Sequence, residues 1–246
     1  MDEETARRLH HLNLAFYRER AAEFSRTRER PWPGWQRLLA WLPETPPRVL
    51  DIGCGNARLA RFLATHRPDA HYEGIDASAP LLSEARARIP AGFDAILHEA
   101  DFLEPASDDV LPRGTFSLVA LFGVLHGVPG DTRRRALVAA AAARLAAGGI
   151  LALAGWRFAE FEDLRRRIVP WSALAARGGP AIDPSQIDPG DHLLSWGDGP
   201  ALRYAHALDG AALADLTRGL RLAPVASYVD DGRDRARNHY AIYRAP

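Results

Sequence analysis

The stretch Val49-Leu50-Asp51-Ile52-Gly53-Cys54-Gly55-Asn56 combines a short apolar run that ends on a carboxylate with a turn that holds two glycines. A helical pattern begins directly after it, at Ala57. In open α/β sheets, a strand, a glycine turn and a helix in this order form the ligand-binding turn, beyond the carboxyl end of the strand. The stretch therefore predicts an α/β fold with a ligand site at this turn.

The turn differs from the dinucleotide fingerprint G-x-G-x-x-G in two ways. Arg58 stands where the third glycine belongs, and Asp51 lies two residues before the first glycine. A carboxylate at that point repels a pyrophosphate but attracts a ligand that carries an amine or a positive charge. S-adenosylmethionine carries an ammonium, a sulfonium and no phosphate, so we predict it as the cofactor. The alternative is a nucleotide-binding turn for an unspecified ligand.

Other predicted strand ends supply further candidates. Asp76 ends the next strand, where a carboxylate holds a ribose diol through two hydrogen bonds. Asp101 is expected to accept a hydrogen bond from the adenine amino group with Phe102 against the ring, or else to cap a helix or lie in solvent. Leu121 and Phe122 are expected to form the apolar floor beneath the donor, with plain core as the alternative.

Composition narrows the class of protein. The 246 residues suit one α/β domain, and the formal net charge of +0 gives no overall sign of a nucleic-acid binder. Cys54 is the only cysteine, which excludes an internal disulfide, and no metal-ligand spacing occurs, so we predict no metal site. No run approaches the about 18 apolar residues of a membrane helix. We therefore predict a cytoplasmic protein with no membrane partner.

Strand and helix patterns alternate along the central part of the chain. We predict a doubly wound, mostly parallel seven-stranded sheet with an antiparallel C-terminal hairpin. The expected strands are 48–52, 72–76, 94–99, 116–122, 150–156, 222–229 and 237–243, and the expected helices are 57–65, 80–89, 131–146 and 210–219. Gly148 and Gly149 are expected to cap the helix that precedes them.

We predict one domain with four parts. Residues 1–45 form an N-terminal helical lid, 46–156 the donor-binding core, and 201–246 a C-terminal helix and hairpin. Residues 157–200 contain several prolines and show no clear periodicity, which predicts an insertion over the site.

Several of these motifs together resemble the class I S-adenosylmethionine-dependent methyltransferases, over roughly 46–156 and again in the terminal hairpin. The resemblance rests on Asp51-Ile-Gly-Cys-Gly-Asn56, Gly74-Ile-Asp76, Ala100-Asp101-Phe102 and Leu145-Ala-Ala-Gly-Gly149. It implies that the cofactor-binding residues are Tyr17, Arg28, Asp51, Gly53, Cys54, Gly55, Asn56, Asp76, Ala77, Asp101, Phe102, Leu121 and Phe122.

The flanking segments resemble the tRNA wobble-uridine carboxymethyl methyltransferases. The matching segments are Tyr17, Phe24-Ser25, Thr27-Arg28, Pro31-Trp32-Pro33, Asp191-His-Leu-Leu-Ser-Trp196, Arg203-Tyr204, His206 and Asn238. The chain departs from that family at His126-Gly127, Asn238-His239 and Ala205, which lie near the expected acceptor pocket. Eukaryotic members work with a zinc-binding activator subunit, and nothing in this chain tells whether it has one.

The flanks also have a physical interpretation. Tyr17 and Arg28 on the lid are expected to close over the donor, with Arg28 pairing with its methionyl carboxylate; the alternative is a core Tyr17 and a solvent-facing Arg28. Arg203 is expected to orient the acceptor carboxylate, with His206 and Asn238 beside it as the other catalytic candidates, unless the three gather only by chance.

Three functions remain open from the sequence. The first is methylation of a carboxylate oxygen on a modified wobble uridine of tRNA, the second is methylation of a small metabolite with 157–200 as the lid, and the third is a non-catalytic binding protein. A carboxylate is ionised at pH 7 and needs no general base. Accordingly, His126 is interpreted as a structural histidine in preference to a base.

Overall fold

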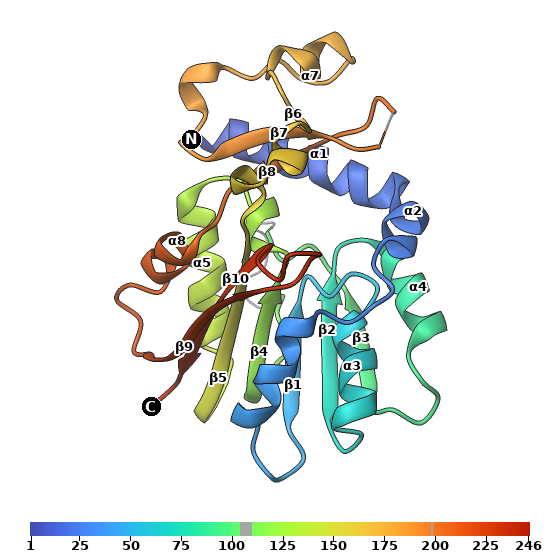
Figure 1. The fold of residues 1–246 in the computed structure, drawn as a ribbon, viewed down its shortest axis with the longest axis vertical. Coiled ribbons are helices and arrows are strands. Elements are labelled where there is room, and N and C mark those ends of the chain that lie inside the picture. The colour runs from blue at the N-terminus through green and yellow to red at the C-terminus, as the bar shows by residue number, and fades with distance from the viewer. Residues whose placement is uncertain (104–109, 198) are drawn as a thin grey trace.

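The computed structural model describes residues 1–103, 110–197 and 199–246. A seven-stranded sheet with the order β3-β2-β1-β4-β5-β10-β9 forms its centre (Figure 1). The first five strands are parallel, and β10 is antiparallel to both of its neighbours, so the predicted fold class is confirmed. The strands are β1 (Arg48–Ile52), β2 (His71–Asp76), β3 (Ala95–Glu99), β4 (Phe116–Phe122), β5 (Leu145–Trp156), β9 (Ala223–Asp230) and β10 (Asn238–Arg244).

Helices cover both faces of the sheet. The first face carries η1 (Pro33–Trp41), α3 (Arg58–His66) and α4 (Ala79–Arg88), and the second carries α5 (Asp131–Ala142) and α8 (Gly210–Leu216). Alternate residues of the central strands enter the two cores: Leu118 of β4 packs with the first set and Val119 with the second. Burial on both sides explains why this strand reads as a continuous apolar run.

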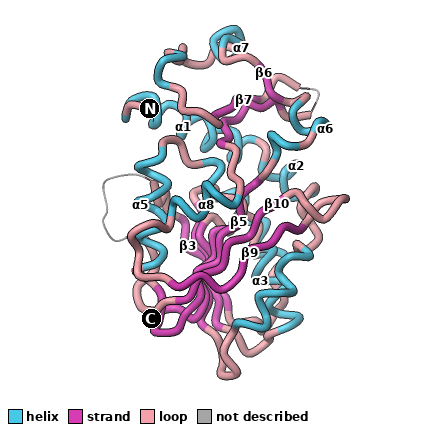
Figure 2. Tube along the Cα trace, turned by 60° about the vertical axis from the view of Figure 1, so that its left-hand side comes forward, coloured by secondary structure: helices cyan, strands magenta, loops and turns pink. Residues whose placement is uncertain are grey.

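A cap lies over the carboxyl ends of the parallel strands (Figures 1 and 2). It contains α1 (Glu3–Glu19), α2 (Ala21–Arg26) and a three-stranded antiparallel sheet of β6 (Ile168–Val169), β7 (Asp191–Ser195) and β8 (Leu202–His206). The short elements η3 (Phe158–Glu160) and α6 (Glu162–Arg165) lead from β5 to β6, and α7 (Ser172–Ala176) and η4 (Pro184–Gln186) lie between β6 and β7. In the described parts of the chain no helix is both long and apolar enough to span a bilayer.

The cap sheet extends beyond the predicted insertion. Strand β8 lies after residue 200, yet it pairs with β7 inside the predicted insertion, with Arg203 opposite Leu194. These strands are too short to show a clear alternation of apolar and polar residues, and the prolines between them suggest irregular structure. The sequence therefore predicts an insertion in this segment but does not predict the three-stranded sheet that it forms.

Asn13 of α1 ties the cap to the core. Its Nδ2 donates to the carbonyl oxygens of Gly127 (3.0 Å) and Tyr204 (3.2 Å), and its Oδ1 accepts the amide of Tyr204 (2.9 Å). Gly127 belongs to η2 (Leu125–Gly127), directly after β4, whereas Tyr204 is in β8. The side chain is buried. The segment predicted as a lid is thus bonded to the turn that follows β4 and to β8 of the cap sheet.

One predicted boundary is wrong. Helix α5 ends at Ala142, and Gly148 and Gly149 lie inside β5, so they do not cap the helix. Gly148 has a φ of +70°, and the register between β4 and β5 shifts between Phe116 and Leu118. A Cβ on Gly149 would lie 2.8 Å from the carbonyl oxygen of Phe116. The two glycines therefore allow the irregular pairing of β4 with β5, where the two backbones approach closely.

Asp231, which the sequence places in a simple hairpin turn, is a buried junction. It is 2% exposed with a φ of +71°. Its Oδ1 accepts the amide of Gly34 in η1 (2.9 Å), and its Oδ2 accepts Nδ2 of Asn238 (2.8 Å) and the hydroxyl of Tyr240 (2.5 Å). One carboxylate therefore connects the C-terminal hairpin to η1.

Replacing Asp231 is expected to destabilise the protein strongly. Asp231→Ala leaves three buried donors unpaired, and we expect a loss of about 3 kcal/mol in the free energy of unfolding. Chemical denaturation with circular dichroism measures the loss. Asp234→Ala in the same turn is the matched control, because that carboxylate forms only a surface pair with Arg237 and should cost less than about 1 kcal/mol. Equal losses in the two variants would contradict the assignment.

Candidate active site

Two cavities lie between the cap and the carboxyl ends of the strands. The larger has a volume of about 320 Å³ and the smaller about 120 Å³. They meet at the glycine turn and share the lining residues Tyr17, Phe24, Gly53, Gly55 and Gly123. The position is the one expected for a ligand, at the point between β1 and β4 where the strand order reverses.

The glycine turn is bonded to the end of the neighbouring strand. The amides of Gly53 and Cys54 donate to the carbonyl oxygen of Ile75 (2.8 and 3.1 Å), and the amide of Gly55 donates to Oδ2 of Asp76 (2.8 Å). Gly53 has a φ of +73°, and a Cβ there would lie 2.7 Å from Val124. Glycine at this position therefore meets both a conformational and a steric requirement.

The smaller cavity is lined by four of the predicted cofactor residues, Asp76, Ala77, Asp101 and Phe102, together with Leu81, Leu103, Val124 and Val128. Oδ1 of Asp76 accepts the amide of Ser78 (2.9 Å), and Oδ2 accepts the amide of Gly55 (2.8 Å). Oδ2 of Asp101 lies 2.7 Å from Nε2 of His10, and Oδ1 accepts the amide of Leu103 (3.0 Å). Asp101 therefore also holds α1, a contact with no signal in the sequence.

Asp51 lines the larger cavity beside Gly53, Cys54 and Asn56. The hydroxyl of Tyr72 donates to its Oδ2 (2.8 Å). Burial raises the pKa of Asp51 to about 7, against the opposing effect of the Tyr72 hydrogen bond. Burial also raises the pKa of the Cys54 thiol, which keeps it protonated. A cation placed next to Asp51 would therefore stabilise the ionised form of this carboxyl, which burial disfavours.

Three arginines line the larger cavity without a carboxylate partner. Within the described part of the chain, no carboxylate oxygen lies within 4 Å of the guanidinium of Arg28, Arg58 or Arg203. Arg28 stacks on Phe24, with 3.6 Å between Cζ and the ring centroid. Burial, and after it the charge of Arg203, lowers the pKa of Arg28 to about 9, so it remains protonated at neutral pH. The cavity therefore favours anions.

Arg203 is the most enclosed of the three, at 3% exposure. Its Cζ lies 4.9 Å from the ring centroid of Trp156, 5.3 Å from that of Trp196 and 5.6 Å from that of Phe16. Its Nη1 donates to the Tyr17 hydroxyl (3.3 Å), and its Nε has no partner. A buried guanidinium held by aromatic rings and one hydroxyl is costly unless a ligand supplies an anion.

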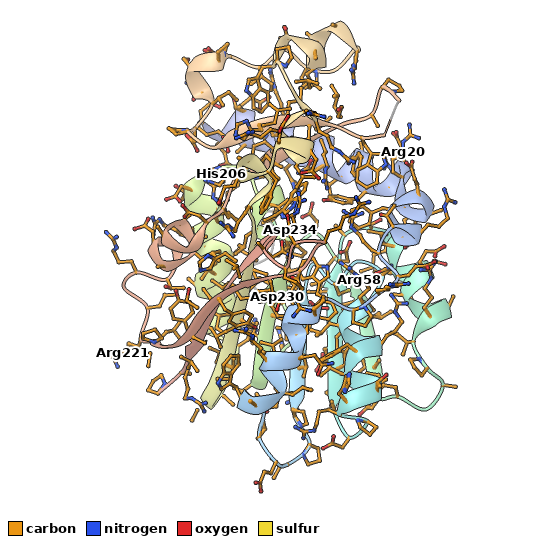
Figure 3. The ribbon with its side chains drawn as sticks, viewed as in Figure 1. Arg20, Arg58, His206, Arg221, Asp230 and Asp234 are labelled. Carbon is orange, nitrogen blue, oxygen red and sulfur yellow. The ribbon has the colours of Figure 1, made fainter. Side chains whose placement is uncertain are left out.

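The three predicted acceptor residues do not come together. Asn238 lines the larger cavity with Arg203, although its Nδ2 is already bonded to Asp231. His206 faces away: its Nδ1 lies 2.7 Å from Oδ1 of Asp191, and Figure 3 shows it on the cap, far from Arg58. Arg203 and His206 are three residues apart in β8, so their side chains point to opposite faces. The expectation that His206 faces the acceptor is therefore wrong.

Leu121 is also misplaced by the prediction. It is fully buried in the core on the α5 side, whereas its neighbour Phe122 lines the larger cavity. Adjacent strand residues cannot share a face. The sequence also missed Trp35, Trp156 and Asp231 as lining residues, because residues far apart in the chain come together here.

Comparison with known proteins identifies the family. A model described as a methyltransferase domain matches residues 50–151. A trans-aconitate 2-methyltransferase from Streptomyces coelicolor is 31% identical over 235 residues, which cover 89% of this chain and 74% of the relative. The chain belongs to the class I S-adenosylmethionine-dependent methyltransferases.

Other relatives align over shorter stretches. A trans-aconitate 2-methyltransferase from Afipia carboxidovorans is 36% identical over 94 residues, and this chain spans only 36% of its length. These relatives are not tRNA wobble-uridine enzymes, so they do not support the resemblance to that family.

Solved structures share the fold. A methyltransferase from Methanosarcina mazei has a TM-score of 0.65 at 18% identity, covering 88% of this chain and 98% of that one. NodS, an N-methyltransferase from Bradyrhizobium japonicum in complex with S-adenosylhomocysteine, has a TM-score of 0.56 at 18% identity, covering 90% and 91%.

The two cavities suit S-adenosylmethionine, the cofactor of this methyltransferase. The Asp76 carboxylate matches a ribose diol, and the apolar lining near Phe102 matches an adenine ring. At the other end, Asp51 matches an ammonium and Arg28 a carboxylate. When bound, the cofactor supplies an electrophilic methyl group on a sulfonium.

Removing the Asp76 carboxylate should weaken donor binding. Asp76→Ala deletes an acceptor for the ribose hydroxyls and releases the Gly55 amide, so we expect a loss of about 2 kcal/mol, or roughly thirtyfold in Kd. Isothermal titration with S-adenosylhomocysteine measures this. The exposed Glu99 at the end of β3 provides the control variant Glu99→Ala, whose Kd should match that of the wild type. Unchanged affinity in Asp76→Ala would refute the assignment.

Donor affinity should rise with pH through Asp51. With a pKa of about 7, this carboxyl is about one tenth ionised at pH 6 and about nine tenths at pH 8. Only the ionised form attracts an ammonium, so affinity for S-adenosylhomocysteine should increase several-fold over this range and then level off. Asp51→Asn should bind weakly with no such rise. If the Asn variant keeps the slope, another group is titrating.

Proposed function

We propose that the protein methylates a carboxylate oxygen of a small polycarboxylate. The observation that carries this proposal is Arg203, a guanidinium at 3% exposure that faces the cavity with no carboxylate partner in the described chain. A planar guanidinium matches a carboxylate through two parallel hydrogen bonds. An acceptor carboxylate would neutralise the buried charge and hold the reacting oxygen in place.

The chemistry fits a site without a general base. A carboxylic acid with a pKa near 4 is ionised at pH 7 and is already nucleophilic. Burial, followed by the charges of Arg203 and Arg28, lowers the pKa of His126 to about 3, so this imidazole is a poor base. The residues of the cavity therefore act by aligning the oxygen with the methyl group and excluding water. Very tight pairing by Arg203 would stabilise the ground state, so its role is placement.

The small acceptor is supported by the relatives and by the charge of the cavity. The curated relatives are named trans-aconitate 2-methyltransferases, and aconitate is a tricarboxylate. If the methionyl carboxylate of the donor pairs with Arg28, then Arg58 and Arg203 are left for two further carboxylates. A volume of about 320 Å³ is also at the lower end of the range for small-ligand sites.

The choice between the small acceptor and tRNA can be tested directly. Transfer of a labelled methyl group is measured with trans-aconitate, with other di- and tricarboxylates, and with tRNA that bears 5-carboxymethyluridine. We expect labelling of a polycarboxylate that is lost when its carboxylates are converted to amides. Labelling of the tRNA alone would establish the tRNA function, which the flanking motifs around Tyr17 and Trp32 suggest.

Arg203→Lys should impair turnover although it retains the charge. A lysine ammonium cannot form the bidentate contact or fill the aromatic enclosure, so we expect kcat/KM for the accepted carboxylate to fall by roughly 30- to 100-fold. Affinity for S-adenosylhomocysteine should remain close to that of the wild type. Arg218→Lys, an exposed position after α8, is the matched control and should be fully active. Wild-type kinetics in Arg203→Lys would remove the basis of the proposal.

A further inference from the structure

His126 is a buried imidazole at the larger cavity whose role the carboxylate chemistry leaves unexplained. It is 7% exposed and lies in η2, directly after β4. Its ring packs edge-on against Trp156, with 5.2 Å between centroids, and the guanidinium of Arg203 contacts the same indole. The residue thus lies next to the group assigned to the acceptor carboxylate.

The two ring nitrogens of His126 have different surroundings. Nδ1 is sealed from solvent and has no hydrogen-bond partner, whereas Nε2 is not sealed. Burying an N–H without a partner costs more than burying a free lone pair, and orphaned N–H groups are rare in proteins. The ring therefore places its proton on Nε2, the nitrogen that a ligand in the cavity can reach.

Protonation of both nitrogens is unfavourable at this position. Burial and the positive charges of Arg203 and Arg28 oppose a second proton, and no carboxylate lies within 4 Å of the ring among the residues that the structure describes. The described acids that line the cavity, Asp51 and Asp231, are bonded to Tyr72 and to Asn238, Tyr240 and Gly34. The ring therefore remains a neutral donor.

We propose that His126 donates from Nε2–H to the acceptor carboxylate and that, with Arg203, it forms a cradle of donors that selects this group. The inference rests on the proposed function, because it names the group that recognises the acceptor. A cradle that only donates accepts a carboxylate, which has only acceptors, and disfavours a carboxamide, whose NH₂ would meet donors. Each carboxylate oxygen has two lone pairs, so an oxygen that accepts a hydrogen bond still keeps a lone pair to attack the methyl group.

The backbone around His126 is held in a way that suits this role. The carbonyl oxygen of the next residue, Gly127, accepts Nδ2 of Asn13, and the Gly127 amide donates to Val124. Helix α1 therefore fixes the turn that carries the imidazole. The imidazole is thus positioned through its backbone and not through a hydrogen bond to the ring. Nε2 therefore remains available to a ligand.

The protonation state of His126 can be read without turnover. Full-length protein labelled with ¹⁵N-histidine is saturated with S-adenosylhomocysteine, and ring nitrogens are followed by NMR from pH 5.5 to 8, with His126→Gln providing the assignment. We expect an Nε2–H tautomer that does not titrate and an Nε2 resonance that shifts on addition of trans-aconitate. An Nδ1–H tautomer, or titration near pH 6.5, would overturn the proposal.

Two variants separate hydrogen bonding from packing. His126→Phe keeps a ring against Trp156 but has no N–H, so KM for the accepted polycarboxylate should rise about tenfold. His126→Gln retains an amide donor and should lose less. Both should bind S-adenosylhomocysteine like the wild type, which excludes misfolding, and His66→Phe on the exposed face of α3 is the substitution control.

The outcomes distinguish this inference from the proposed function. Methylation of a polycarboxylate with an unchanged KM in His126→Phe overturns the role of His126 and leaves the function intact. A protein that neither methylates nor binds any small carboxylate, whatever its tautomer, overturns both. Equal activity on carboxylates and their carboxamides, with the expected tautomer, overturns the selection by the cradle.

Discussion

The bond between the turn after β1 and the end of β2 is the constraint on which the site depends. The amides of Gly53 and Cys54 share the carbonyl oxygen of Ile75, and the amide of Gly55 is held by Asp76. Together with the bond from the Ser78 amide to Oδ1 of Asp76, these bonds set the conformation of the turn and hold both oxygens of this carboxylate. The same contacts therefore shape the turn and orient the carboxylate that faces the donor.

The charge balance of the larger cavity follows from which groups already have partners. Asp51 is bonded to Tyr72, and Asp231 accepts three hydrogen bonds from its own surroundings. Arg203, by contrast, has aromatic neighbours and no carboxylate in the described chain. The lining arginines Arg28, Arg58 and Arg203 outnumber the lining acids Asp51 and Asp231, which leaves a positive cavity in a protein whose formal net charge is +0. Net charge says little about a site of this kind.

The cap supplies half of that site. Arg203 lies on β8, while Tyr17 and Arg28 come from the N-terminal segment, and Asn13 bonds α1 to β8 and to the turn that carries His126. Segments separated by nearly the whole chain therefore meet at the larger cavity, to which the central sheet contributes the glycine turn and Asp51.

The sequence by itself determined the sheet, the donor turn and the strand-end acids Asp51 and Asp76, because strand periodicity and glycine geometry act over a few neighbouring residues. It did not show that Arg203 and Phe122 line the cavity whereas His206 and Leu121 do not. Which side chains of a strand point into the cavity depends on the alternation of side chains along the strand and on which face of the sheet is covered. Only the tertiary structure decided the burial of Asp231, the enclosure of Arg203 and the position of His126 beside it. Each of these depends on contacts between segments far apart in the chain, for which local patterns carry no signal.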